Sequence, residues 1–487
     1  MNKNFLFFFT EKPLKMIMLG FSSGLPILLV FSTLSVWLTK AGIERSTVTL
    51  FSWAGFAYAF KFLWSPLVDK VNIPFFFKMG HRRSWLLLTQ LLIIFSLILT
   101  SLNDPQKSVL ITALCITLVA FFSATQDIII DAYRIESVEQ ELQGSLSSMY
   151  IAGYRIGMLV GGAGSLWLAS YWGAENYDHN VWKKVYLTMS ILMFIGIFAN
   201  FISREPKKTR KFSNKTSLHF KFFINILISV IIFIIIYSNL NNPFADKNFL
   251  SFLFTLLKLI ICFVCSGLYI FLQIKLKIQD PSIIKKSYYN PINNFIEKYG
   301  KFALLILLLI SLYRIADVVM GVMANIFYLE KGYSVGEIAT YSKFFGVLAT
   351  IIGGLFGGYF AMKFGTMITL FVGALIASLS NLLFAWLATT ETNIKYLISV
   401  ITADNISSGF AGAAFVIYLS GLTSLKFTAT QYALFSSIML FLPKLIAGYS
   451  GSWVDVMGYQ NYFITTALIG IPVLFLIIYI SKKAPIK

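Results

Sequence analysis

The sequence predicts an all-α polytopic membrane protein with about 14 transmembrane helices. Two observations predict this class: 57% of the 487 residues are hydrophobic, and only 13% are charged, about half the charged fraction of an average soluble domain. These figures exclude a soluble enzyme, a disulfide scaffold and a disordered chain. The net charge of +19 would also suit nucleic-acid binding. Basic clusters between apolar segments are typical of membrane topology, however, so we expect the lipid bilayer and no nucleic acid as a partner.

Fourteen segments are long and apolar enough to cross a bilayer, which takes about 20 residues of helix. They are 14–38, 47–68, 84–102, 108–130, 145–170, 184–203, 221–238, 249–273, 301–326, 336–361, 366–389, 396–423, 430–454 and 460–481. When the N-terminus is placed in the cytoplasm, 26 of the 40 Lys and Arg residues lie on cytoplasmic segments and 8 on outward loops. This asymmetry follows the positive-inside rule, so we predict that both termini are cytoplasmic.

An internal repeat relates the first six spans to the last six. Val36–Ile43, after the first span, resembles Phe327–Ser334, after the ninth span and 291 residues later. Ser65–Lys70 and Gly358–Lys363 correspond in the same way at the ends of the second and tenth spans. Each match is weak alone, but together they indicate two related halves of six helices.

The repeat predicts three parts of the chain. Residues 1–203 form an N-terminal six-helix bundle, residues 204–300 hold cytoplasmic linkers with two extra transmembrane helices, and residues 301–487 form a C-terminal six-helix bundle. Parallel repeats of this size are typical of the major facilitator fold. In that fold the substrate binds between the halves, and rocking of the halves gives alternating access.

Charged residues inside the spans are the strongest indicators of a site, because each costs ~2.5–3.5 kcal/mol at the bilayer centre unless it faces a wet cavity or another charge. Cations outnumber acids here, and an excess of positive charge in a cleft favours an anionic substrate. We predict substrate-binding roles for Lys61, Arg155, Arg314, Asp317, Lys343, Asp404, Lys444 and Tyr154. Arg314 and Asp317 could equally neutralise each other. Tyr154 could stack on a sugar ring or could simply fill the interior.

Two acids are candidates for proton coupling. Asp127 and Asp131 lie four residues apart and share one face of the fourth span. A buried carboxylate can exchange a proton with the coupling gradient. Both acids could instead pack as salt bridges to Arg134 or Arg155, so the two interpretations stay open.

The loop after the second span predicts a cytoplasmic gate. Asp69 is followed by a basic cluster that contains Arg82 and Arg83. The carboxylate can pair with a basic residue in one conformation and release it when the halves rock. An ordinary positive-inside loop is the alternative.

The sequence predicts neither catalytic nor metal-binding residues. The three His residues, His81, His179 and His219, lie in loops without a neighbouring nucleophile or ligand pattern. Cys262 and Cys265 lie within an apolar span, where we interpret them as packing residues. We therefore expect no enzyme activity, no cofactor and no metal. Glycine clusters in the fifth and tenth spans indicate close helix packing and not phosphate loops.

Several of these segments resemble the bacterial muropeptide permeases (AmpG-type) of the major facilitator superfamily. The resemblance covers nearly the whole chain and is more specific than the gate pattern alone. The stretches that carry it are Gly20–Pro26, Lys61–Asp69, Ala124–Arg134, Tyr313–Asp317, Leu348–Gly353 and Ala429–Leu434.

The resemblance implies a multi-pass importer of the bacterial inner membrane that is driven by protons and acts as a monomer. Its implied cargo is N-acetylglucosaminyl-1,6-anhydro-N-acetylmuramic acid, with or without the stem peptide, for peptidoglycan recycling. Such a glycopeptide carries carboxylates, in agreement with the excess of cations. Two alternatives stay open: a transporter of acetyl-CoA or another organic anion, and a non-transporting membrane sensor.

Overall fold

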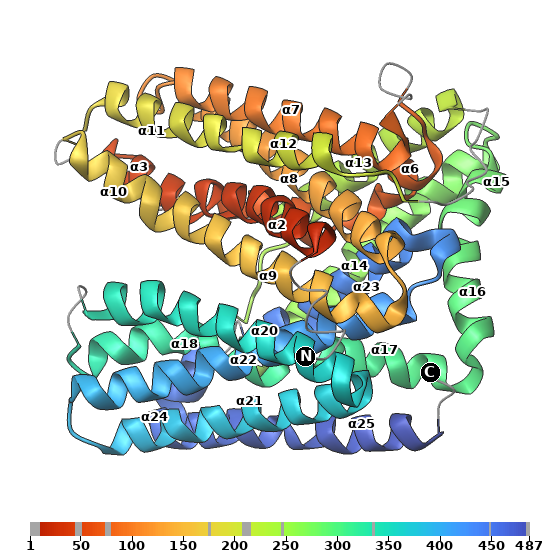
Figure 1. Cartoon of the computed structure of the whole chain (residues 1–487). Helices are drawn as coiled ribbons and strands as arrows, with labels where there is room; N and C mark the ends of the chain where they lie inside the picture. The colour runs from red at the N-terminus through yellow and green to blue at the C-terminus, as the bar shows by residue number, and fades with distance from the viewer. Residues whose placement is uncertain are drawn as a thin grey trace.

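The computed structural model describes residues 10–43, 51–73, 79–173, 177–206, 216–244, 248–333, 337–447 and 450–483. Within these ranges every regular element is a helix, which confirms the predicted all-α class. The described chain forms two layers of helices that lie side by side, with the connecting helices at one edge (Figure 1).

The helices of the first layer come from the first part of the chain. They are α2 (Glu11–Val30), α3 (Ser32–Lys40), η1 (Phe51–Gly55), α5 (Phe56–Ala59), η2 (Lys61–Leu63), α6 (Ser65–Lys70), α7 (His81–Leu102), α8 (Val109–Ser137), η4 (Gln140–Leu142), α9 (Gln143–Leu159), η5 (Val160–Gly164), α10 (Ser165–Tyr171), α11 (His179–Leu192) and α12 (Phe194–Ile202). Aromatic side chains form part of the hydrophobic core of this layer. The Trp37 ring stacks on Trp182 with centroids 5.9 Å apart and also contacts Tyr186.

The helices of the second layer come from the last part of the chain. They are α17 (Ala303–Leu312), α18 (Ile315–Glu330), η8 (Ile338–Phe345), α20 (Gly346–Phe364), α21 (Thr366–Thr389), α22 (Ile394–Leu422), η9 (Leu425–Phe427), α23 (Thr428–Ala447), α24 (Ser450–Ile469) and α25 (Ile471–Lys483). Its core includes the stacked rings of Tyr313 and Phe415, with centroids 4.5 Å apart. We refer to the two layers as the N-terminal and C-terminal halves.

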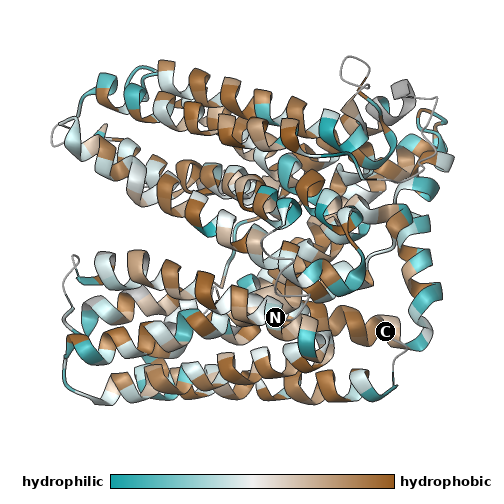
Figure 2. Cartoon of the chain, in the orientation of Figure 1, coloured by the Kyte–Doolittle hydropathy of each residue, from teal (hydrophilic) through white to brown (hydrophobic). Residues whose placement is uncertain are grey.

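Between the halves the chain forms two long helices and several short ones at the edge. They are α13 (Thr216–Asn239), α14 (Asn248–Lys275), α15 (Pro281–Ile284), η6 (Lys285–Tyr289), α16 (Asn290–Tyr299) and η7 (Gly300–Phe302). Many large side chains of α13 and α14 are exposed, among them Ile231, Ile260 and Phe271. Such a surface suits contact with lipid, and hydrophilic residues gather at the helix ends near α6, α15 and α16 (Figure 2).

Twelve helices of the described chain are long and apolar enough to cross a membrane, so the protein passes the bilayer several times. Two of the fourteen predicted spans differ from this set. The described part of the second span is divided into four short helices between Phe51 and Lys70. The fifth span is continuous from Gln143 to Tyr171. It falls outside the set because its Gly, Ser and Tyr residues lower its hydropathy.

Glycine residues allow α2 and α9 to pack with their backbones in contact. A Cβ atom at Gly20 or Gly24 would clash with the main chain of Tyr150 or Tyr154, and one at Gly153 would clash with the carbonyl of Ile17. This confirms that the glycines of the fifth span serve close helix packing. The same contact fixes the position of Tyr154 and Arg155 on α9.

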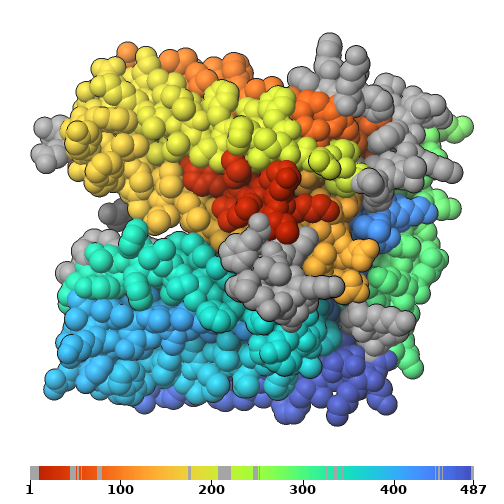
Figure 3. All heavy atoms as spheres, viewed as in Figure 1, coloured from red at the N-terminus to blue at the C-terminus, as the bar shows by residue number. Residues whose placement is uncertain are grey.

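The two halves contact each other at one end and separate at the other. The Ser148 hydroxyl of α9 donates a hydrogen bond to the carbonyl of Gly354 on α20 (2.9 Å). At the opposite end, near α3 and α10, the surface is hollowed between the halves (Figure 3). The contact end is the end that the basic residues predict to be cytoplasmic, so we call it the basic end.

Candidate functional site

Asp127 lies at the centre of a buried group of neutral polar side chains. Its carboxylate accepts a hydrogen bond from the Ser23 hydroxyl of α2. The same hydroxyl lies 3.0 Å from the Tyr150 hydroxyl of α9. Among the described residues, no Lys or Arg nitrogen lies within 4 Å of the Asp127 carboxylate. A carboxylate in these surroundings can exist in its protonated form without breaking an ion pair.

Asp131, one turn further along α8, is held by cations. Its carboxylate lies 3.8 Å from the Lys61 ammonium nitrogen and 3.3 Å from Arg134 Nη2. The pairing with Arg134 that the sequence left open is therefore present for Asp131. Lys61 is buried beside this carboxylate, on the N-terminal half. Arg134 lies on α8 itself, but Ser23, which contacts Asp127, and Lys61, which contacts Asp131, lie on other helices, and the i, i+4 spacing did not reveal these two contacts.

Arg155 and Arg314 bring positive charge to the space between the halves. Arg155 lies on α9 and Arg314 lies between α17 and α18. The two guanidinium groups are near enough for their positive charges to repel each other. Arg314 pairs with Asp317 (Nε–Oδ2 2.8 Å) and donates to the Ser408 hydroxyl (3.1 Å). In the described part of the chain, Arg155 has no carboxylate within 4 Å; its Nη1 lies 3.7 Å from the Met158 sulfur. Arg155 is thus available for an anionic group.

Two further predicted residues lie close to these cations. Asp404 on α22 accepts a hydrogen bond from the Ser380 hydroxyl (3.2 Å). It lies near enough to Asp317 and Arg314 for their charges to act on its carboxyl group. Tyr154 is half-buried on α9, with its ring centroid 6.0 Å from that of Tyr150. Tyr154 and Arg155 on the N-terminal half and Arg314, Asp317 and Asp404 on the C-terminal half thus form a chain of neighbours, in which Arg155 and Arg314 are near enough to interact across the halves.

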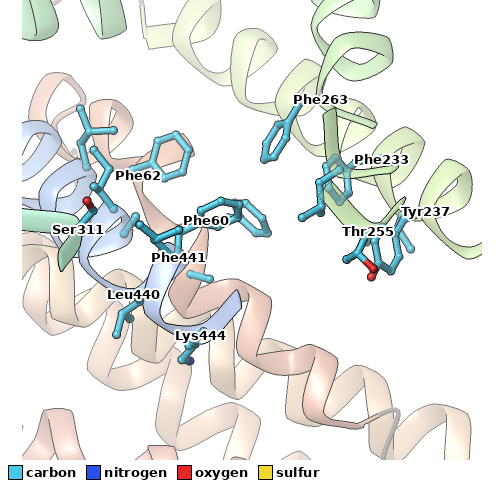
Figure 4. A pocket seen from close by; sticks show the side chains of 17 residues that line it. Phe60, Phe62, Phe233, Tyr237, Thr255, Phe263, Ser311, Leu440, Phe441 and Lys444 are labelled. Carbon is cyan, nitrogen blue, oxygen red and sulfur yellow. The ribbon is translucent and has the colours of Figure 1, made fainter. Parts of the chain in front are cut away.

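Lys444 and Lys343 stand apart from this group. Lys444 lines an apolar cavity of about 520 Å³ between the halves and the pair α13–α14 (Figure 4). Phe60 of the N-terminal half, Phe441 of the C-terminal half and Phe263 of α14 face this cavity. Among the described residues of the lining, Lys444 is the only charged one. The Lys343 side chain lies outside the described part of the structure.

A cluster of buried hydrogen-bonded residues at the basic end joins the two halves through Arg82, and we call it the gate cluster after the role that the sequence predicts for it. We define it as Asp69, Arg82, Glu136, Thr428 and Thr430. Arg82 Nη2 donates to Asp69 (2.8 Å), to Glu136 (2.9 Å) and to the Thr428 hydroxyl of α23 (3.1 Å). The Thr430 amide and hydroxyl donate to Asp69 at 3.0 and 2.9 Å. All charged members are buried, so these hydrogen bonds form away from bulk water.

Opposing effects set the protonation of Asp69. Burial alone would raise the pKa of this carboxyl, but the positive charge and the hydrogen bond of Arg82 outweigh it and lower the pKa of Asp69 below its ordinary value. Asp69 is therefore ionised at neutral pH and can hold both Arg82 and Thr430.

Arg83 has a different environment from Arg82. Its Nε and Nη2 donate to the carbonyls of Asn200 and Phe201 at the end of α12, and its amide donates to Glu205. These contacts fasten α7 to α12 within the N-terminal half. The predicted gate role of Arg83 stays a prediction.

Sequence reasoning missed the residues on the opposite side of the gate. Thr428, Thr430 and Ser420 are ordinary hydroxyl residues at the ends of α22 and α23, and only their position against Asp69, Arg82 and Arg134 gives them a role. Glu136 carried a weak signal, because it lies two residues after Arg134 at the end of an apolar span that also holds Asp127 and Asp131.

A family model described as Major Facilitator Superfamily matches residues 16–448. The chain belongs to the major facilitator superfamily. Among curated relatives, a Rickettsia felis protein named transporter AmpG 4 is 32% identical over 465 residues, covering 96% of this chain and 95% of the relative. An anhydromuropeptide permease of Escherichia coli K12 is 28% identical, covering 95% of this chain and 78% of the relative. The resemblance to AmpG-type permeases is thereby confirmed.

Solved structures agree on the major facilitator fold. The proton:xylose symporter XylE superposes with a TM-score of 0.60 at 10% identity, covering 97% of this chain and 94% of that one. FucP in its outward conformation superposes with a TM-score of 0.62 at 11% identity, covering 97% and 99%. The chain is therefore a multi-pass membrane transporter of this superfamily, built to move a small-molecule substrate.

Proposed function

We propose that the protein imports anhydro-muropeptides, with or without the stem peptide, across the bacterial inner membrane by proton symport for peptidoglycan recycling. The observation that carries the coupling is the difference between Asp127 and Asp131. Asp127 has neutral partners, whereas Asp131 is paired with Lys61 and Arg134. Asp127 can gain and lose a proton at lower cost, because Asp131 must give up two cations on protonation.

The charge of the central space supports an anionic cargo. Arg155 is free of carboxylates among the described residues, and Arg314 keeps donors beyond its pair with Asp317. Muropeptides carry carboxylates, and the Escherichia coli relative is named for this cargo. The AmpG-named relatives favour the muropeptide over acetyl-CoA or another organic anion.

The arrangement of the halves suits import. With both termini in the cytoplasm, as we propose, the gate cluster closes the cytoplasmic end and the hollow between the halves faces outward. Cargo would enter this hollow together with a proton on Asp127. Release to the cytoplasm then requires Arg82 to leave Thr428 and Asp69 to leave Thr430.

Uptake of radiolabelled anhydro-muropeptide into right-side-out vesicles tests the proposal. Vesicles with an inward proton gradient should accumulate the cargo, and a protonophore should abolish the accumulation. Vesicles without the gradient should only equilibrate. Absence of uptake by a folded and inserted protein would contradict the muropeptide assignment, and acetyl-CoA and short acidic peptides would be the next cargoes.

A further inference from the structure

The short helix α16 (Asn290–Tyr299) differs from the membrane-spanning helices because it runs across the basic end of the C-terminal half. Figure 1 shows it crossing the direction in which α17 runs. It packs against the first two turns of α23: Gln431 donates to the Pro291 carbonyl (2.8 Å), and the Phe295 and Phe435 rings have centroids 5.1 Å apart. Because α23 begins at Thr428, α16 lies at the level where this span leaves the membrane.

The side chains of α16 fall into three sectors around the helix. Phe295 and Tyr299 are buried against the protein. Asn294, Glu297 and Lys298 line an open polar hollow shared with the loop after α22. This hollow marks the side of α16 that faces water at the basic end.

The third sector is apolar and exposed. Ile292 and Ile296 are 42% and 47% exposed, and Tyr289, one turn earlier, is 57% exposed. At 3.6 residues per turn, the two isoleucines lie on the side of the helix opposite Asn294 and Lys298. A sector opposite to the water-facing side, at the level where a span leaves the membrane, points towards the hydrocarbon.

Basic residues surround this apolar sector. The segment from Lys275 to Lys301 holds six lysines but two acids, Asp280 and Glu297. Asp280 is engaged as the N-cap of α15, where it accepts from the Ser282 amide (2.8 Å). Four of the lysines flank α16 or lie on it, and all four are exposed: Lys285, Lys286, Lys298 and Lys301.

We propose that α16 is an interfacial helix that binds anionic phospholipid headgroups. Ile292, Ile296 and Tyr289 enter the leaflet at the basic end, and Lys285, Lys286, Lys298 and Lys301 contact the phosphates. An apolar sector opposite a polar side that carries lysine, here Lys298, with further lysines just before and after the helix, is the arrangement that holds a helix in the plane of a membrane surface. Anionic lipid is the partner because the lysines outnumber the acids three to one in this segment.

Fluorescence quenching tests the position of the apolar sector. In full-length protein with Cys115, Cys262 and Cys265 replaced by Ala, a bimane label is placed at Ile296→Cys or at the adjacent Glu297→Cys. Both proteins are reconstituted in vesicles of phosphatidylglycerol and phosphatidylcholine. Lipid brominated in the acyl chain should quench the label at position 296, and aqueous iodide should quench the label at position 297. Iodide quenching at 296 without quenching by brominated lipid would overturn the proposal.

Spin-labelled lipids test the headgroup preference independently. The fourfold variant with Lys285, Lys286, Lys298 and Lys301 changed to Gln should lose at least about three-fold in its preference for phosphatidylglycerol over phosphatidylcholine, since a single lysine near the membrane surface already contributes about a factor of five. The matched control changes four exposed lysines at the same end, Lys363, Lys426, Lys482 and Lys483, to Gln. An unchanged preference in the α16 variant, or an equal loss in the control, would overturn the assignment to α16.

Discussion

Arg134 on α8 donates a hydrogen bond to the Ser420 hydroxyl at the end of α22 (Nη1–Oγ 2.9 Å), while its Nη2 pairs with Asp131 (3.3 Å). One guanidinium thus joins the acid next to Asp127 to the opposite half of the transporter. The same Nη1 also donates to Ser147 within its own half (2.7 Å). We propose that this guanidinium links the protonation of Asp127, one turn from Asp131 on α8, to the contact between the halves.

Removal of the Ser420 hydroxyl should favour opening of the basic end. Hydrogen bonds to a charged group contribute ~1.5–3 kcal/mol, so Ser420→Ala should change the ratio of outward-open to inward-open molecules by roughly ten-fold or more. Ser147→Ala removes an equivalent hydrogen bond from the same guanidinium without crossing between the halves, and it should leave the ratio nearly unchanged. Distances between spin labels at positions 170 and 389 report the ratio, and equal effects of the two variants would contradict the path.

Asp127 should carry the coupling proton, whereas Asp131 should hold the structure. Asp127→Asn keeps a side chain that can hydrogen-bond Ser23, so the variant should fold, insert and exchange cargo across the membrane without accumulating it. Asp131→Asn leaves the buried Lys61 and Arg134 without their carboxylate and should lower stability by ~3–5 kcal/mol. Counterflow uptake and gradient-driven uptake separate the two outcomes. Undiminished gradient-driven accumulation by Asp127→Asn would refute this role.

Arg155 should contribute to cargo affinity without a structural penalty. Arg155→Gln removes a cation that pairs with no described carboxylate, so stability should change little. The KM for the peptide-bearing cargo should rise about ten-fold or more, because a charge-assisted hydrogen bond contributes ~1.5–3 kcal/mol. Lys395→Gln, at an exposed lysine near the start of α22, serves as the control for net charge. An unchanged KM would assign Arg155 to packing.

Gly358 should be essential for closure of the basic end. A Cβ atom at Gly358 would clash with the Ser148 hydroxyl and lie 2.6 Å from the Gly144 carbonyl of the opposite half. Gly358→Ala should therefore destabilise the outward-open state by ~1–3 kcal/mol and slow uptake several-fold. Gly354→Ala, one turn away on α20, would meet its neighbours at 3.7 Å, an ordinary contact distance. Uptake and thermal unfolding of the two variants test the difference, and equal defects would count against it.

The gate cluster should not set the pH dependence of transport. Because the pKa of Asp69 lies below its ordinary value, its contribution to the closed gate is present above the ordinary pKa near 3.9 and is lost only as the pH falls through the lowered value. Asp69 therefore stays ionised between pH 5 and 8. Asp69→Asn should reduce uptake by a similar factor at every pH in this range and leave the midpoint of the profile in place. A displaced midpoint would show that Asp69 takes part in proton coupling.

The sequence by itself determined the class of protein and the positions of most of its membrane-spanning helices, but not the division of the second span into short helices or the helix α16. Hydropathy and length are local properties of the chain, so they predicted the all-α membrane fold, and the repeat with the quoted motifs predicted the superfamily. Local pattern also predicted that Asp69 could pair with a basic residue of the following cluster, with an ordinary positive-inside loop as the alternative, and the structure shows that the partner is Arg82. The sequence also showed the lysines near α16, but it identified them only as charges of a cytoplasmic linker and not as neighbours of an apolar helix side.

The tertiary structure decided how equivalent residue types differ from one another. Asp127 and Asp131 share a helix face, and only the positions of Ser23 and Lys61 on other helices show that Asp127 contacts a neutral hydroxyl and that Asp131 contacts a second cation besides Arg134 of its own helix. The inter-half partners Thr428 and Ser420, and the closure of the halves at the basic end, depend on contacts between residues hundreds of positions apart. Periodicity and composition contain no information about such contacts, because they report on neighbours along the chain and not on neighbours in space.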